Sequence, residues 1–116
     1  MMAKEKRKGL IRMKKVINGK RYDTETATMI TSDSYANHGD FDHWFEALYR
    51  TKKGNWFLYG EGNARSQYAR RTGQNEVSGG STIIPFSDHD ALAWLEAHTE
   101  DSGIYESYFT DVIEDA

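Results

Sequence analysis

The residues best suited to chemistry are two histidines and two aspartates, His38, Asp40, Asp42 and His43. Imidazole and carboxylate groups are common ligands of Zn²⁺ and Mn²⁺. Their spacing matches no established metal-ligand motif, and the same polar sequence is typical of turns closed by local side-chain hydrogen bonds. We therefore expect no metal ion and no cofactor. A metal-dependent enzyme at these four residues is the alternative.

The sequence contains none of the common catalytic signatures. A nucleophile elbow, a His-Glu-x-x-His zinc motif, an EF-hand loop and a P-loop are all absent. Because the chain has no cysteine, disulfide bonds, thiol catalysis and cysteine-ligated zinc are excluded. No serine has an obvious histidine and acid partner, so we predict a protein that is not an enzyme.

Charge is distributed unevenly along the chain. Residues 1–17 hold seven Lys and Arg against one Glu, whereas residues 72–116 hold ten Asp and Glu and no Lys or Arg. Such asymmetry favours a charged interaction surface, although an acidic face that only maintains solubility is an alternative interpretation. The acidic residues predicted to contact a partner are Asp88, Asp90, Glu96, Glu100, Asp101, Glu106, Asp111 and Glu114.

The element that must position these charges is a predicted β-hairpin at residues 43–62. Two aromatic-rich segments flank a short turn that ends in Gly54, where a left-handed backbone favours glycine. With a three-residue turn Leu48 faces Leu58 and Arg50 faces Trp56, whereas a turn of another length would change these partners. Both faces carry large apolar groups, so we expect helices on both faces or one face open to a partner. The hairpin residues predicted to reach a partner are Trp44, Arg50 and Trp56.

Other segments predict an α+β fold, in which a small antiparallel sheet built on the central hairpin packs with two or more α-helices. The two C-terminal helices are acidic on their outer sides, and their apolar stripes can cover both faces of the hairpin or pack together on one. The predicted elements are a strand and Asn-Gly turn at 16–22, helices at 24–30, 64–72, 88–98 and 103–113, loops at 31–42 and 74–81, and a strand at 82–86.

The length of 116 residues fits a single domain. We predict a basic, mobile arm at residues 1–12 and one α+β domain at residues 13–116. The longest apolar runs are only a few residues, and the basic N-terminus lacks the apolar core of a signal peptide. We therefore expect a cytoplasmic protein without a membrane partner, as a monomer or a small homo-oligomer.

Several segments resemble a family of small uncharacterised proteins carried on bacterial mobile elements, including phages. The family includes candidate anti-CRISPR inhibitors. The resemblance covers roughly residues 13–98, and it rests on residues 19–27, 48–58, 60–62 and 83–85. It implies inhibition of a CRISPR effector complex and supplies no catalytic residue.

The charge pattern and the resemblance together lead to one functional expectation. Carboxylates at helical spacing can imitate a row of phosphates, so the acidic surface would bind and block a basic nucleic-acid groove of a CRISPR effector subunit by DNA mimicry. On this interpretation the chain does not itself contact nucleic acid. The alternative is a nucleic-acid-binding protein that uses the basic arm, the aromatic residues of the hairpin, the lysines Lys52 and Lys53 of its turn, and the arginines Arg65, Arg70 and Arg71.

Overall fold

The computed structural model describes residues 11–116. Its largest element is an antiparallel sheet of four strands in the order β3-β4-β5-β8. These strands are Thr28–Tyr35, Trp44–Arg50, Trp56–Gly62 and Gly80–Phe86. The chain therefore has the predicted α+β class, with the central pair β4 and β5 at the predicted hairpin.

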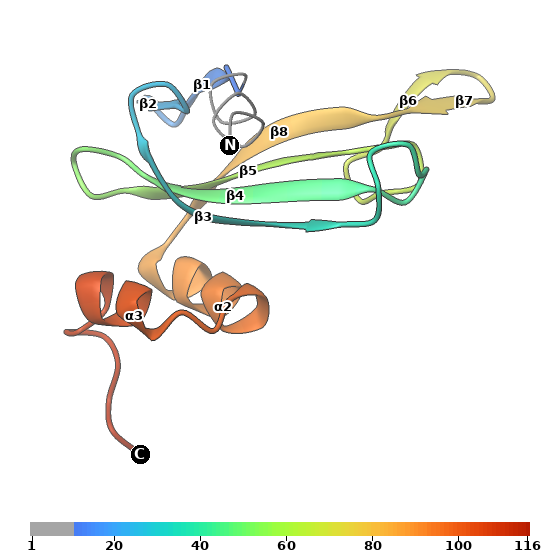
Figure 1. Ribbon diagram of the computed structural model, residues 1–116. Coiled ribbons are helices and arrows are strands. Elements are labelled where there is room, and N and C mark those ends of the chain that lie inside the picture. The colour runs from blue at the N-terminus through green and yellow to red at the C-terminus, as the bar shows by residue number, and fades with distance from the viewer. Residues whose placement is uncertain (1–10) are drawn as a thin grey trace.

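Each face of this sheet is covered by a different kind of element (Figure 1). A small hairpin of β1 (Lys14–Ile17) and β2 (Lys20–Asp23) lies over one face. Helices α2 (Asp88–His98) and α3 (Ser102–Tyr108) lie together over the other face. A further hairpin, β6 (Arg70–Gly73) with β7 (Glu76–Ser78), extends past one end of the sheet.

The register of the central hairpin confirms the prediction. Leu48 pairs with Leu58, Tyr49 with Phe57 and Arg50 with Trp56. Gly54 has a φ of 89°, a left-handed conformation that favours glycine. The turn is closed by the amide of Gly54, which donates to the carbonyl of Thr51 at 2.9 Å.

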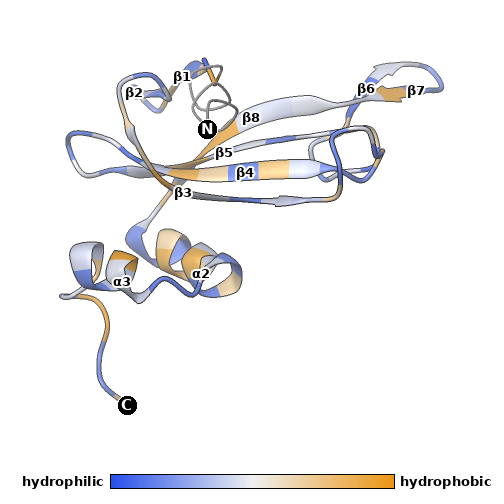
Figure 2. Ribbon diagram, in the orientation of Figure 1, coloured by the Kyte–Doolittle hydropathy of each residue, from blue (hydrophilic) through white to orange (hydrophobic). Residues whose placement is uncertain are grey.

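Side chains alternate between the two faces of β4 and β5, so the protein has two apolar cores. The core under the β1–β2 hairpin contains Phe45, Ala47, Tyr49, Phe57, Tyr59 and Ile83, together with Ile11 and Tyr22. The core under the helices contains Leu48, Trp56, Leu58, Ala91, Trp94, Leu95 and Phe109. Figure 2 shows the apolar residues that run along β4 and α2. Both helical stripes pack on one face, and strands rather than a helix cover the other.

Two of the predicted helices are wrong. Residues 24–27 form a turn that leads into strand β3, and residues 64–68 form a turn-rich loop before strand β6. Asp23, which directly precedes the predicted helix at 24–30, accepts a hydrogen bond from the amide of Glu25 at 2.9 Å and closes a turn. A carboxylate such as that of Asp23 can accept from a nearby backbone amide at the start of a helix or in a turn. The β-branched residues Thr28, Ile30 and Thr31 then favour the strand β3 over a helix. The predicted loop at 31–42 correspondingly begins within β3, and the predicted loop at 74–81 includes β7 and the first residues of β8.

The two C-terminal helices are present, and α2 has the predicted bounds. Helix α3 ends at Tyr108, earlier than predicted, because Phe109 leaves the helical conformation as the C-cap and is buried. Its ring stacks on Trp56 with 5.1 Å between centroids. The apolar residues after Tyr108 therefore pack against the core from a non-helical segment, and they do not extend α3.

The folded chain includes the last residues assigned to the N-terminal arm. Ile11 is buried in the core beneath β1 and β2, and its carbonyl accepts a hydrogen bond from the Thr24 hydroxyl at 3.0 Å. The remainder of the predicted arm, residues 1–10, lies outside the described residues.

Candidate interaction surface

A buried carboxylate lies at the junction between the sheet and the helix layer. Glu46, on β4, is 4% exposed. One of its oxygens accepts a hydrogen bond from the indole of Trp94 at 2.8 Å, and the other accepts from the hydroxyl of Tyr68 at 2.5 Å and from the amide of Gln67 at 2.7 Å. A buried carboxylate is costly unless such donors surround it, so these contacts fix helix α2 and the 63–69 loop against the sheet.

The backbone leaves room for this arrangement at one glycine. Gly60 on β5 pairs with Glu46 across the sheet. A Cβ atom at Gly60 would overlap the ring of Tyr68, which therefore lies directly over this position. Burial, followed by the hydrogen bond to Glu46, raises the pKa of Tyr68. The hydroxyl therefore stays protonated and acts as a donor to the carboxylate.

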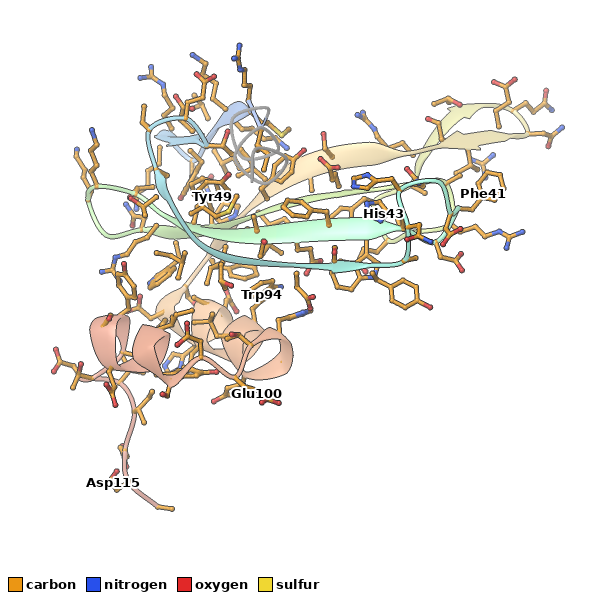
Figure 3. The ribbon with its side chains drawn as sticks, viewed as in Figure 1. Phe41, His43, Tyr49, Trp94, Glu100 and Asp115 are labelled. Atoms are coloured by element: carbon orange, nitrogen blue, oxygen red, sulfur yellow. The ribbon has the colours of Figure 1, made fainter. Side chains whose placement is uncertain are left out.

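The C-terminal end of α2 is held by a histidine between two tryptophans. The ring of His98 stacks on Trp94 with 4.3 Å between centroids, and its edge-to-face contact with Trp44 spans 5.9 Å. Its Nδ1 donates to the carboxylate of Asp33 on β3 at 2.7 Å. Figure 3 shows Trp94 between the sheet and the helix layer. Polar and aromatic contacts together fix the orientation of α2, and hence of its outer side.

The outer side of this helix layer is acidic. Residues 87–116 contain nine Asp and Glu and no Lys or Arg. All nine of these carboxylates are exposed, including the eight acidic residues predicted to contact a partner. Six of these eight lie on α2, on α3 or in the loop between them, and Asp111 and Glu114 lie in the segment after α3. We call the eight residues the acidic layer.

Two members of the acidic layer also cap the helices. Asp90 accepts from the amide of Ser87 at 3.0 Å in a capping box, and this backbone hydrogen bond lowers the pKa of its carboxyl. Asp101 accepts from the amide of Gly103 at 2.9 Å at the start of α3. Within residues 11–116, no Lys or Arg forms a salt bridge with the acidic layer. Its negative charge is therefore not neutralised by ion pairs in this part of the chain.

The three predicted contact residues of the hairpin differ in accessibility. Trp44 is half-buried and stacks on the exposed Tyr35 with 6.3 Å between centroids. The half-buried guanidinium of Arg50 lies 4.8 Å from the ring centre of Trp56. Trp56 is 2% exposed, so the prediction that it reaches a partner is wrong. Its indole instead fills the core beneath α3.

The three arginines of the alternative nucleic-acid site are not brought together with the aromatic rings of the hairpin. Arg65, Arg70 and Arg71 are exposed, but Arg65 lies over Phe41 at 5.7 Å and the other two belong to β6. Most aromatic side chains of β4 and β5 are buried in the two cores. Apart from the half-buried Trp44, the central hairpin therefore offers no ring on which a base could stack.

The histidine and aspartate cluster forms part of the turns before β4. His43 is buried, and its Nδ1 donates to the carbonyls of Tyr35 and Ala36 at 3.0 and 3.1 Å. Its Nε2 has no hydrogen-bond partner within residues 11–116. The ring of His38 lies 4.5 Å from that of His43, and Asp40 accepts from the amide of Asn37. Among the described residues no group of three or more potential ligands is placed to hold a metal ion.

One feature of the sequence indicates that Glu46 needs hydrogen-bond partners. Glu46 alternates with Trp44 and Leu48 on an otherwise apolar face, so its burial requires hydrogen-bond donors. The donors come from residues 21 to 48 positions away in the sequence, and no local pattern identifies them.

No family model, curated protein or solved structure matches this chain. None of the helices in residues 11–116 has the length and apolar character needed to cross a membrane.

Proposed function

We propose that this protein is a non-enzymatic inhibitor that binds a basic, nucleic-acid-binding surface of another protein through the acidic layer. The single observation that carries the proposal is the exposure of all eight acidic residues on the two helices and the segments next to them, without Lys or Arg between them. Opposite charges on two surfaces accelerate association and specify the orientation of the complex.

The rigidity of the layer supports a binding role. The hydrogen bonds of Glu46 and His98 fix α2 on the sheet, and the stacking of Phe109 on Trp56 fixes the chain after α3. A surface that is ordered before binding loses less conformational entropy when the complex forms. Half-buried Trp44 lies beside α2 through its contact with His98, and can add an aromatic contact at the edge of the same surface.

The partner that we propose is a subunit of a CRISPR effector complex. Such complexes hold nucleic acid in positively charged channels, which an acidic protein surface can occupy. The resemblance of residues 13–98 to mobile-element proteins that include candidate inhibitors motivates this choice. The acidic layer would then compete with the phosphates of the target DNA.

The test is a pull-down from cells that contain a CRISPR effector, with mass spectrometry of the retained proteins. The wild-type protein should retain the effector, and the variant Glu106→Lys/Asp111→Lys should not. The variant Asp42→Lys/Glu76→Lys is the matched control, because it makes the same charge change at two exposed residues outside the helix layer. Equal retention by both double variants contradicts the acidic-layer proposal.

A further inference from the structure

A cluster of positive charge lies on the face of the sheet opposite the helices. The turn between β1 and β2 and the turn between β4 and β5 border a cavity of about 370 Å³. Among residues 11–116, four cationic residues contribute to its lining and no carboxylate does. We call these four residues, Lys20, Arg21, Lys52 and Lys53, the hairpin basin.

The two turns that form the hairpin basin have defined conformations. Asn18 and Gly19 have φ angles of 53° and 79°, as in the two-residue turns that suit a β-hairpin. The β4–β5 turn is closed by hydrogen bonds between Thr51 and Asn55, of which the amide of Thr51 donates at 2.8 Å. Tyr22 of β2 packs edge-on against Phe57 of β5 at 5.6 Å. This contact holds the small hairpin beside the β4–β5 turn.

The cations of the hairpin basin are available to a ligand. All four are exposed, and none forms a salt bridge within residues 11–116. The nearby acids have other contacts, since Asp23 accepts from the amide of Glu25 and the carboxylate of Glu25 lies 3.5 Å from Arg12. Four like charges around one cavity repel one another, so an anionic ligand would relieve this repulsion.

The shape of the positive surface favours a ligand with several phosphates. Lys14 and Lys15 on β1 are exposed and continue the positive charge along the small hairpin. The one aromatic residue of the cavity lining, Tyr22, is 7% exposed, so its ring cannot stack on a base. Threonine and asparagine side chains at Thr26, Thr51 and Asn55 add neutral polar groups to the lining. These groups suit contacts to phosphate and sugar, which position a nucleic acid without reading its sequence.

We propose that the hairpin basin binds the phosphate backbone of a nucleic acid, without base specificity. This site shares Lys52 and Lys53 with the nucleic-acid alternative considered from the sequence, but it replaces the arm, the three arginines and the aromatic rings of that alternative with Lys20 and Arg21. It also revises the expectation that the chain makes no contact with nucleic acid. The acidic layer lies on the other side of the sheet. One molecule would then contact a basic protein through the acidic layer, and the nucleic acid bound to that protein through the hairpin basin.

The experiment is a titration of the full-length protein into a fluorescently labelled single-stranded oligonucleotide at low salt, followed by anisotropy. Lys52→Gln/Lys53→Gln should weaken binding by about tenfold or more. The slope of log affinity against log salt should also fall by about 1.4, since each phosphate contact on a single strand contributes about 0.7. Oligonucleotides of different sequence should bind with similar affinity.

The matched control is Arg70→Gln/Arg71→Gln, which removes the same charge from exposed residues of β6. This variant should keep the wild-type affinity and salt slope. Equal weakening by both variants, or no weakening by either, overturns the proposal. A polyglutamate chain of equal charge tests the nature of the ligand, and tighter binding of polyglutamate than of the oligonucleotide also overturns it.

Discussion

The indole nitrogen of Trp94 on α2 donates to the buried carboxylate of Glu46 on β4 at 2.8 Å. This contact joins the helix layer to the centre of the sheet across 48 positions of sequence. It also gives the carboxylate a donor that a hydrophobic neighbour would not supply. The orientation of the acidic layer depends on this hydrogen bond and on those from Tyr68 and Gln67 to the same carboxylate.

Replacing Glu46 by leucine should therefore destabilise the protein strongly. Trp94 and Tyr68 would each retain a buried donor without an acceptor, at about 1–3 kcal/mol for each unpaired group. Glu46→Gln keeps one acceptor oxygen and should have a smaller effect. Urea unfolding measures the change, with the exposed Glu96→Gln on α2 as a control expected within about 0.5 kcal/mol of wild type. Stability of Glu46→Leu equal to that of the control would contradict the anchoring role.

Adding one methyl group at Gly60 should displace Tyr68 from this carboxylate. The Cβ atom of Gly60→Ala would overlap the tyrosine ring, and such overpacking costs about 1–3 kcal/mol. Gly39→Ala is the control, because nothing lies within 4 Å of a Cβ at that position. Thermal unfolding of the two variants compares them directly. A melting temperature of Gly60→Ala at or above that of Gly39→Ala would show that Tyr68 does not need this space.

Stability should decrease at alkaline pH because two buried tyrosines remain protonated in the folded state. Burial raises the pKa of Tyr49 to about 12, and the pKa of Tyr68 is also raised. Above pH ~10 a tyrosine in the unfolded chain loses its proton, while the folded state keeps it. The free energy of unfolding should then fall as pH rises from about 10 to 12, by about 1.4 kcal/mol per pH unit for each tyrosine.

Denaturant unfolding at a series of pH values measures this slope. Between pH ~10 and ~12, Tyr49→Phe should make the fall of the unfolding free energy with pH less steep, by about 1.4 kcal/mol per pH unit. Tyr35→Phe removes a tyrosine that is 56% exposed and should leave the slope unchanged. Identical slopes for wild type and Tyr49→Phe would contradict the assignment of this effect to Tyr49.

The central part of the fold is predictable from sequence because its interactions are local. Gly54 and the aromatic alternation around it determine the pairing of β4 with β5, and Ser87 with Asp90 determines the start of α2. The segment after Gly62 was not predictable in this way. Its conformation depends on the contact of Tyr68 with Glu46, so a tertiary interaction overrides the helical propensity of residues 64–72.

The candidate surface was predictable in composition but not in arrangement. The acidic character of residues 87–116 is evident in the sequence, and the structure places α2 and α3 together on one face of the sheet, with the C-terminal segment extending away from them. The burial of Trp56 was not evident, because alternation in a strand separates two faces without identifying which is covered. The hairpin basin joins Lys20 and Arg21 to Lys52 and Lys53, which only the packing of β2 on β5 brings together.

The substitution Phe109→Ala should detach the segment that follows α3 from the core. Phe109 is 1% exposed, and its loss leaves a cavity beside Trp56 that costs about 3–5 kcal/mol. Tryptophan fluorescence during urea unfolding reports both the loss of stability and the hydration of Trp56. Ile113→Ala, at a residue 44% exposed, should change stability by much less. Equal effects of the two variants would contradict the role of Phe109 as the anchor of this layer.

The central claim is that the acidic layer occupies a basic nucleic-acid groove of a CRISPR effector, and competition with target DNA tests it most directly. Labelled duplex DNA bound to a purified, guide-loaded effector complex is titrated with this protein, and displacement is followed by anisotropy. The account predicts that wild type and Asp42→Lys/Glu76→Lys displace the DNA, that higher salt weakens the effect, and that Glu106→Lys/Asp111→Lys displaces at least about tenfold less. Displacement by the last variant at wild-type concentrations, or no displacement from any effector by the wild-type protein, would contradict the account.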